Sequence, residues 1–234
     1  PNIKDWPEQP ALSDDLLVKV VSYITDPVTT TDELIPSGET SSYRSNPLGL
    51  AEFTLSRKDP AYVGLAKEIH KAQEALMDGK DPVTVKPELA EIMDEIHVQF
   101  PQAANDNLGF GSTIFAVKPG DGSAREQAAS CQKVLGGWAN IANEYATKRY
   151  RSNLINWGML PFVIPDGDLP FTNHDYLFFP GIRKAVEEKA AEITGYVVDA
   201  NGLKPFTVTL GELTDEERQI ILKGCLINYN RVEK

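Results

Sequence analysis

The order of apolar and polar positions along the chain predicts strands that alternate with helices. Residues 16–24 form an apolar, β-branched run, which is typical of a buried strand. Between Pro60 and Gly79 the apolar side chains keep helical spacing, and a second helical stripe begins near Pro87. Another apolar run, at residues 113–117, predicts a strand that leads through a glycine-containing loop into a helix.

The second half of the chain continues this alternation and ends richer in strands. An Asn201-Gly202 pair between apolar runs at residues 193–198 and 206–210 indicates a β-hairpin. The sequence Thr-Asp-Glu-Glu at residues 214–217 has the capping-box pattern that begins a helix. The pattern as a whole predicts an α/β fold, a mixed-sheet sandwich with flanking helices. Its remaining elements are predicted as a strand at 138–143, a helix at 146–156 and a strand at 160–164.

Two segments lack a regular pattern. Residues 1–13 contain three prolines, so we interpret them as an interdomain linker or leader, with one domain over residues 14–234. Residues 25–55 form a long loop that holds Asp32 and Glu33 among other polar side chains. Because loops of this length in compact domains are usually functional or disordered, we expect a functional one.

Composition narrows the possible partners. The chain has 34 acidic and 23 basic residues and a net charge of −11, which argues against nucleic acid or an anionic membrane. No apolar run approaches the ~18 residues of a membrane span and no signal peptide is evident, so we expect a cytoplasmic protein. Cys131 and Cys225 are too few and too distant for a disulfide framework or a zinc site, and the three histidines are scattered. No metal site is predicted in this chain.

The segment best suited to chemistry is the glycine loop at residues 118–122 with the helix after it. A helix N-terminus carries unpaired N–H groups and about half a positive charge, so it favours anions. The Walker and dinucleotide-binding patterns are both missing, which argues against a nucleotide. Ser123 is either a helix N-cap or a hydroxyl whose stabilised alkoxide removes a carbon-bound proton. Arg125 either pairs with Asp121 or Glu126, or binds a substrate carboxylate.

Two motifs in the chain resemble the aconitase family. GSAREQAA at residues 122–129, followed by LGG at 135–137, is similar to the family's Gly-Ser-Ser-Arg-Glu-His-Ala-Ala segment and the Leu-Gly-Gly after it. Upstream, TTDE at residues 30–33 resembles the family's Thr-Thr-Asp-His, and Arg44 lies twelve residues beyond Asp32, as in aconitase. The two motifs occur in the family's order with its internal spacing.

The resemblance implies a swivelling β/β/α domain, the C-terminal domain of an aconitase-like hydro-lyase that reversibly dehydrates a hydroxy di- or tricarboxylate. By position in the motifs, Ser123 is expected to be the alkoxide base, and Asp32 an active-site aspartate that orients its neighbours. Arg44 and Arg125 are expected to bind substrate carboxylates. Ala124 occupies a substrate-binding position where the family has a second serine, so one substrate hydrogen bond is expected to be lost.

The resemblance also implies a [4Fe–4S] cluster in the full-length enzyme, held by cysteines of the preceding domains. Two distant cysteines cannot replace three positioned ones, so we expect this chain to bind no cluster and to be inactive alone. The expected partners are cluster-bearing N-terminal domains, on the same polypeptide or on a large subunit, and a small carboxylate substrate. Nucleic acid and membranes are not expected partners.

Two alternatives stay open. In the first alternative, the chain is a separate small subunit of an isopropylmalate-type dehydratase, although its proline-rich start instead favours a linker to further domains. Or it is a non-catalytic anion-binding module, which Ala124 and Gln127 favour because they replace a family serine and histidine. The stretch at residues 58–98 is more helical than the family's usual connection, and it either shapes the pocket or covers the outside of the domain.

Overall fold

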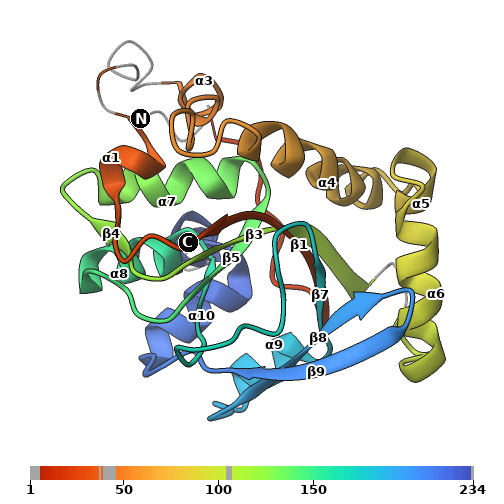
Figure 1. Cartoon of the computed structure of the whole chain (residues 1–234). Helices are drawn as coiled ribbons and strands as arrows, with labels where there is room; N and C mark the ends of the chain where they lie inside the picture. Colours follow the sequence, from red (N-terminus) through yellow and green to blue (C-terminus); the bar gives the residue numbers. More distant parts are fainter. Residues whose placement is uncertain (1–5, 37, 39–45, 104–106, 233–234) are drawn as a thin grey trace.

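A seven-stranded mixed sheet forms the centre of the described part of the chain (Figure 1). This computed structural model describes residues 6–36, 38, 46–103 and 107–232. The strand order is β6-β5-β3-β1-β7-β8-β9; β1, β3, β5 and β6 run parallel, and β7, β8 and β9 alternate in direction. The strands are β1 (Asp15–Ile24), β3 (Leu108–Ala116), β5 (Gly137–Ala142), β6 (Leu160–Val163), β7 (Tyr176–Phe179), β8 (Ile193–Asp199) and β9 (Gly202–Val208).

The sheet curls until its two outer strands meet. Val163, at the end of β6, and Thr209, just after β9, exchange backbone hydrogen bonds with N–O distances of 2.7 and 2.9 Å. Because these bonds join opposite ends of the strand order, the curled sheet presents little free edge to other chains.

Helices cover both faces of this sheet: in Figure 1, α4 and α7 lie over one face, and α9 and α10 lie under the other. Neighbouring β1 residues divide between the faces, since Val20 packs in one core cluster with Ile221 and Val21 in another with Ala128. No helix in the described part of the chain is both long and apolar enough to cross a membrane. The helices are α1 (Thr31–Leu34), α3 (Pro47–Ala51), α4 (Tyr62–Met77), α5 (Pro82–Val85), α6 (Leu89–Gln99), α7 (Arg125–Val134), α8 (Lys148–Asn156), α9 (Ile182–Glu187), α10 (Asp215–Lys223) and α11 (Leu226–Val232).

The predicted α/β fold class is confirmed, with differences in detail. The helices expected from Pro60 and from about Pro87 are α4 and α6, and the Asn201-Gly202 hairpin is the turn between β8 and β9. β3 starts at Leu108, earlier than the predicted strand at residues 113–117. The described residues of the predicted loop at 25–55 include the short helices α1 and α3 and the two-residue strand β2 (Thr29–Thr30).

The described part of the predicted leader packs against the domain. The Trp6 and Trp157 ring centroids lie 4.4 Å apart. Further along, the Leu12 backbone N–H donates to the Leu222 carbonyl at 3.1 Å, and the Leu12 side chain is buried in the core. Residues 6–12 therefore contribute to the same folded unit as the helices that they contact, and the interpretation of residues 1–13 as a linker stays a prediction.

Candidate functional site

A short parallel ladder brings the two sequence motifs together. β2 pairs with β4 (Pro119–Asp121), which follows β3 directly. In this ladder Thr29 lies opposite Pro119 and Thr30 opposite Asp121. The TTDE segment and the start of the GSARE segment, about ninety residues apart in sequence, are therefore backbone neighbours. The ladder lies beyond the carboxyl ends of β1 and β3, the edge where open α/β sheets commonly bind ligands.

Beyond the ladder, Gly122 lets the two motifs approach closely. A Cβ atom at Gly122 would lie 2.2 Å from Thr31 Oγ1, and the residue has a φ of +133°, so a side chain here is excluded on two grounds. Asp32 and Ser123 are the next residues along the two segments, and both side chains are exposed. The structure thus brings these two predicted site residues to one edge of the domain.

A tyrosine supports the other glycine of the loop. Gly120 has a φ of +102°, and a Cβ there would lie 2.3 Å from Cγ of Tyr150, so the ring occupies the space that a side chain would need. Thr147, the N-cap of α8, donates from its hydroxyl to the Gly120 carbonyl at 3.1 Å. The Tyr150 backbone N–H in turn donates to Thr147 Oγ1 at 3.1 Å. The N-cap and first turn of α8 therefore fix the conformation of the glycine loop.

The Tyr150 hydroxyl is itself part of a closed, buried hydrogen-bond network. It donates to Asn140 Oδ1 at 2.6 Å and accepts from Gln132 Nε2 at 2.9 Å. Asn140 Nδ2 completes the triangle by donating to Gln132 Oε1 at 2.6 Å. Burial raises the pKa of Tyr150, so the hydroxyl stays neutral. Because the three partners come from α7, α8 and β5, the network ties the glycine loop to the core.

Ser123 does not cap the helix after it. α7 begins at Arg125, and its N-cap residue Ala124 makes no side-chain capping hydrogen bond. The interpretation of Ser123 as a plain N-cap is therefore wrong, because the helix starts two residues later than the sequence pattern suggests. The exposed Ser123 hydroxyl precedes a helix N-terminus that receives no side-chain hydrogen bond from its N-cap residue.

Arg125, in the first turn of α7, carries an unsatisfied donor. Its Nε atom is buried and has no hydrogen-bond partner within the described residues. This atom therefore makes no hydrogen bond to Asp121 or Glu126, the local partners that the sequence offered. A buried guanidinium N–H without a partner is costly, and an anion bound beside it would remove that cost.

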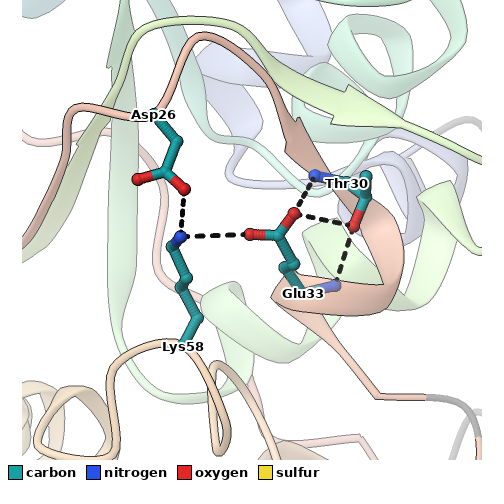
Figure 2. A network of polar contacts seen from close by, with 4 residues as sticks. All are labelled: Asp26, Thr30, Glu33 and Lys58. Carbon is teal, nitrogen blue, oxygen red and sulfur yellow. Dashed lines mark hydrogen bonds and ion pairs between the residues drawn. The ribbon is translucent and has the colours of Figure 1, made fainter.

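Next to the segment that carries Asp32, a lysine bridges two carboxylates (Figure 2). Lys58 contacts the Asp26 carboxylate and lies 3.4 Å from Glu33 Oε2. Glu33 Oε1 accepts from the Thr30 backbone N–H at 3.4 Å and from its hydroxyl at 3.2 Å, and the Glu33 N–H donates to Thr30 Oγ1 at 3.1 Å. Together these contacts form a capping box on α1, the single turn that carries Asp32.

Sequence reasoning found some of these residues and missed others. Ser123, Ala124, Arg125 and Asp32 lie around the ladder, whereas the predicted carboxylate ligand Arg44 lies outside the described residues. The Thr30-x-x-Glu33 spacing is a capping-box signal that was readable from the sequence. The roles of Lys58 and of the Tyr150 network depend on long-range contacts, for which the chain offers no local pattern.

The chain's sulfur and carboxylate groups do not fit the implied iron–sulfur cluster. Cys131 is buried in α7 and Cys225 is buried after α10, in separate surroundings. Burial raises the pKa of the Cys131 thiol to about 12, which disfavours the thiolate that a cluster needs. Within the described residues, no three His, Cys, Asp or Glu side chains gather in a way that could hold a metal ion.

Three comparisons with known proteins bear on this geometry. Residues 93–167 match the family model of the aconitase C-terminal domain. The fold is similar to that of 3-isopropylmalate dehydratase (leuD) from Methanocaldococcus jannaschii, with a TM-score of 0.53 and 20% identity over 93% of this chain and 95% of that chain. No curated protein matches the chain in sequence.

The family match contains Ser123, Ala124 and Arg125, and it excludes the TTDE motif, which reaches the same place through the β2–β4 ladder. The sequence motif at residues 122–129 and the LGG at 135–137 both lie within this independent family match. Over residues 93–167 the chain is therefore similar to the C-terminal domain of the aconitase family.

Proposed function

We propose that this chain is the swivelling domain of an aconitase-like hydro-lyase, which reversibly dehydrates a hydroxy di- or tricarboxylate. The observation that carries the proposal is the β2–β4 ladder. It places the segment with Asp32 beside the segment with Ser123 at one edge of the domain. Neither motif alone implies a site, and their juxtaposition is what a shared role requires.

In the proposed reaction, Ser123 acts as the base. Its alkoxide takes a proton from the substrate carbon as the C–H bond breaks, a carbon–carbon double bond forms, and the hydroxyl on the neighbouring carbon leaves. Unpaired N–H groups at the start of α7 and the Arg125 guanidinium stabilise the negative charge on the Ser123 oxygen. Asp32, from the other side of the ladder, orients these groups.

Substrate carboxylates are assigned to the arginines. Arg125 offers the buried Nε donor that lacks a protein partner. We propose that it binds one carboxylate together with the N-terminus of α7, and that Arg44 binds a second one. Ala124 occupies the motif position where the family has a serine, so the substrate is expected to make one hydrogen bond fewer than in aconitase.

The remaining half of the reaction is assigned to a partner. The family relationship implies a [4Fe–4S] cluster in the complete enzyme, where it would act as a Lewis acid on the departing hydroxyl. We propose that cluster-bearing domains, on the same polypeptide or on a large subunit, dock over the ladder and complete the site in the cytoplasm. The chain alone is expected to be inactive, and aconitate turnover by the purified chain would contradict that.

The test is Ser123→Ala in the assembled enzyme, assayed by the absorbance of the unsaturated product with citrate and 3-isopropylmalate as trial substrates. We expect kcat to fall by about 10²–10⁴-fold while KM changes by less than about threefold. Ser152→Ala, at an exposed position on α8, is the matched control and should leave both constants unchanged. Full activity in Ser123→Ala would remove the base from the proposal.

A separate small subunit of an isopropylmalate-type dehydratase is the second candidate. The observation that favours it is the extent of the structural match, because the superposition covers 95% of the 3-isopropylmalate dehydratase chain. An antibody against this chain separates the two candidates in source cells. A band near 26 kDa would favour a separate subunit, and a band near three times that mass would favour a domain of a longer enzyme.

A further inference from the structure

We propose that Lys58 is a positioning residue of this site: it clamps the segment that carries Asp32 against the glycine loop that carries Ser123. The inference rests on the proposed function, and it assigns a role to the first residue of the helical stretch at 58–98, whose contribution to the site was open.

The clamp joins the two ends of one loop. Asp26 lies just after β1 and Glu33 lies in α1, so the Lys58 ammonium bridges the beginning and the end of residues 26–33 (Figure 2). Lys58 comes from the turns between α3 and α4, and its side chain is 27% exposed. Contact with Asp26, and then with Glu33, raises the pKa of Lys58, so the bridging charge persists throughout the neutral range.

The clamped loop is the one that meets the glycine turn. Thr30, which holds Glu33 through the capping box, pairs with Asp121 in the β2–β4 ladder. Thr31 then packs against Gly122, with no room for a Cβ atom between them. Because Asp32 stands between Thr31 and Glu33, a force that holds Glu33 also holds Asp32 relative to Ser123.

Charge gives a second reason for the lysine. Without it, the Asp26 and Glu33 carboxylates would lie near each other without a cation between them, and they would repel both one another and an anionic substrate. The family motif has a histidine where this chain has Glu33. Lys58 therefore compensates for the acidic residue at position 33, and it does so from the turns between α3 and α4.

The first experiment measures the clamp without any assay of activity. In Lys58→Met we expect the Glu33 amide, which is bonded to Thr30 Oγ1, to exchange its hydrogen up to about fivefold faster, and the NMR signals of the Gly122 and Ser123 amides to shift. Lys58→Arg should keep wild-type behaviour within twofold. Lys67→Met is the control, because it breaks a more exposed ion pair, with Glu52, that is not part of the Lys58 contacts.

The second experiment measures the consequence in the assembled enzyme. We expect Lys58→Met to lower kcat about fivefold with KM changed by less than twofold, and Lys58→Arg to restore most of kcat. The proposal is wrong if Lys58→Met leaves Glu33 exchange unchanged, if Lys67→Met has an equal effect, or if the exchange changes while kcat does not. An active Ser123→Ala enzyme would instead refute the proposed function, and the exchange data would still decide whether the clamp exists.

Discussion

The two halves of the candidate site are anchored in opposite ways. The glycine loop rests on Tyr150, whose hydroxyl belongs to a buried network of neutral side chains. The Asp32 segment is held by the ladder and by partly exposed charges, with the Asp26 and Glu33 side chains 47% and 33% exposed. Buried hydrogen bonds are costly to break and insensitive to salt, whereas exposed ion pairs are weak and screened.

This difference suggests a division of labour. The side with the proposed base is built into the core, so its geometry should persist until the whole domain unfolds. The side with Asp32 is attached by contacts worth little each, so it should loosen locally and respond to ionic strength. The following changes are ordered from the largest expected effect to the smallest.

Gly120→Ala should destabilise the protein most, because it disturbs the contact between the glycine loop and Tyr150. The new Cβ would overlap the Tyr150 ring and would have to adopt a φ of +102°, so we expect a loss of at least about 3 kcal/mol in the free energy of unfolding, measured with urea. Gly167→Ala is the control, because its φ of +127° is comparable and nothing lies within 4 Å of the added atom. Equal losses in the two variants would show that the Tyr150 contact is unimportant.

Lys133 tests how the buried side tolerates a charge. Its Nζ atom lies 3.8 Å from the centroid of the Trp138 ring, and burial lowers the pKa of Lys133 to about 7. Between pH 7 and 9 the unfolded chain keeps a proton that the folded chain has lost, so unfolding free energy should rise by about 2 kcal/mol. Above pH 9 the raised pKa of the Cys131 thiol works in the opposite direction.

Lys133→Met should abolish that rise and make the protein more stable than wild type at pH 7, as seen in urea titrations at a series of pH values. Lys184→Met, at a side chain that is 75% exposed, should keep the wild-type slope. A wild-type slope in Lys133→Met would mean that Lys133 stays charged in the folded state.

Tyr150→Phe removes only the hydroxyl, so it isolates the hydrogen-bond network from the ring contact. Asn140 Oδ1 and Gln132 Nε2 would each lose a partner in a buried place, and we expect a loss of about 1–3 kcal/mol. Thermal unfolding would register this as a fall of several degrees. Tyr196→Phe, at a partly exposed ring, should change the midpoint little.

Glu33→Gln tests how much the exposed ion pair between Lys58 and Glu33 contributes to stability. Glutamine can keep the capping-box contact with Thr30 while losing the charge that faces Lys58, so the unfolding free energy should fall by less than about 1 kcal/mol. In 1 M NaCl the difference from wild type should disappear. Tyr150→Phe measured in the same salt should keep its full effect, and a salt-sensitive Tyr150→Phe would contradict the comparison.

Local patterns predicted much of this architecture. Periodicity located α4, and the Asn201-Gly202 pair located the β8–β9 turn, because both signals lie within a few residues of the element they define. The β2–β4 ladder could not be predicted in this way. Its strands have two and three residues, and their pairing depends on Gly122 meeting Thr31 across about ninety residues of sequence.

The candidate site shows the same limit. The motifs predicted that Ser123 and Asp32 belong to one site, and the β2–β4 ladder brings their backbone segments together at one edge of the domain. The motifs gave no sign of Lys58, because its partners Glu33 and Asp26 lie 25 and 32 residues away in sequence. The start of α7 was predicted at Ser123 because serine is a frequent cap, and the glycine turn delays it to Arg125.

The position of β1 in the middle of the sheet also bears on synthesis of the protein. β1 pairs with β3 along one edge and with β7 along the other, and β7 lies about 150 residues farther along the chain. At a ribosomal rate of about 5–20 residues per second, that second edge stays open for roughly 8–30 s after β1 has been translated. A nascent chain translated only as far as β6 still lacks β7, β8 and β9, so it should need protection by chaperones until these strands have left the ribosome.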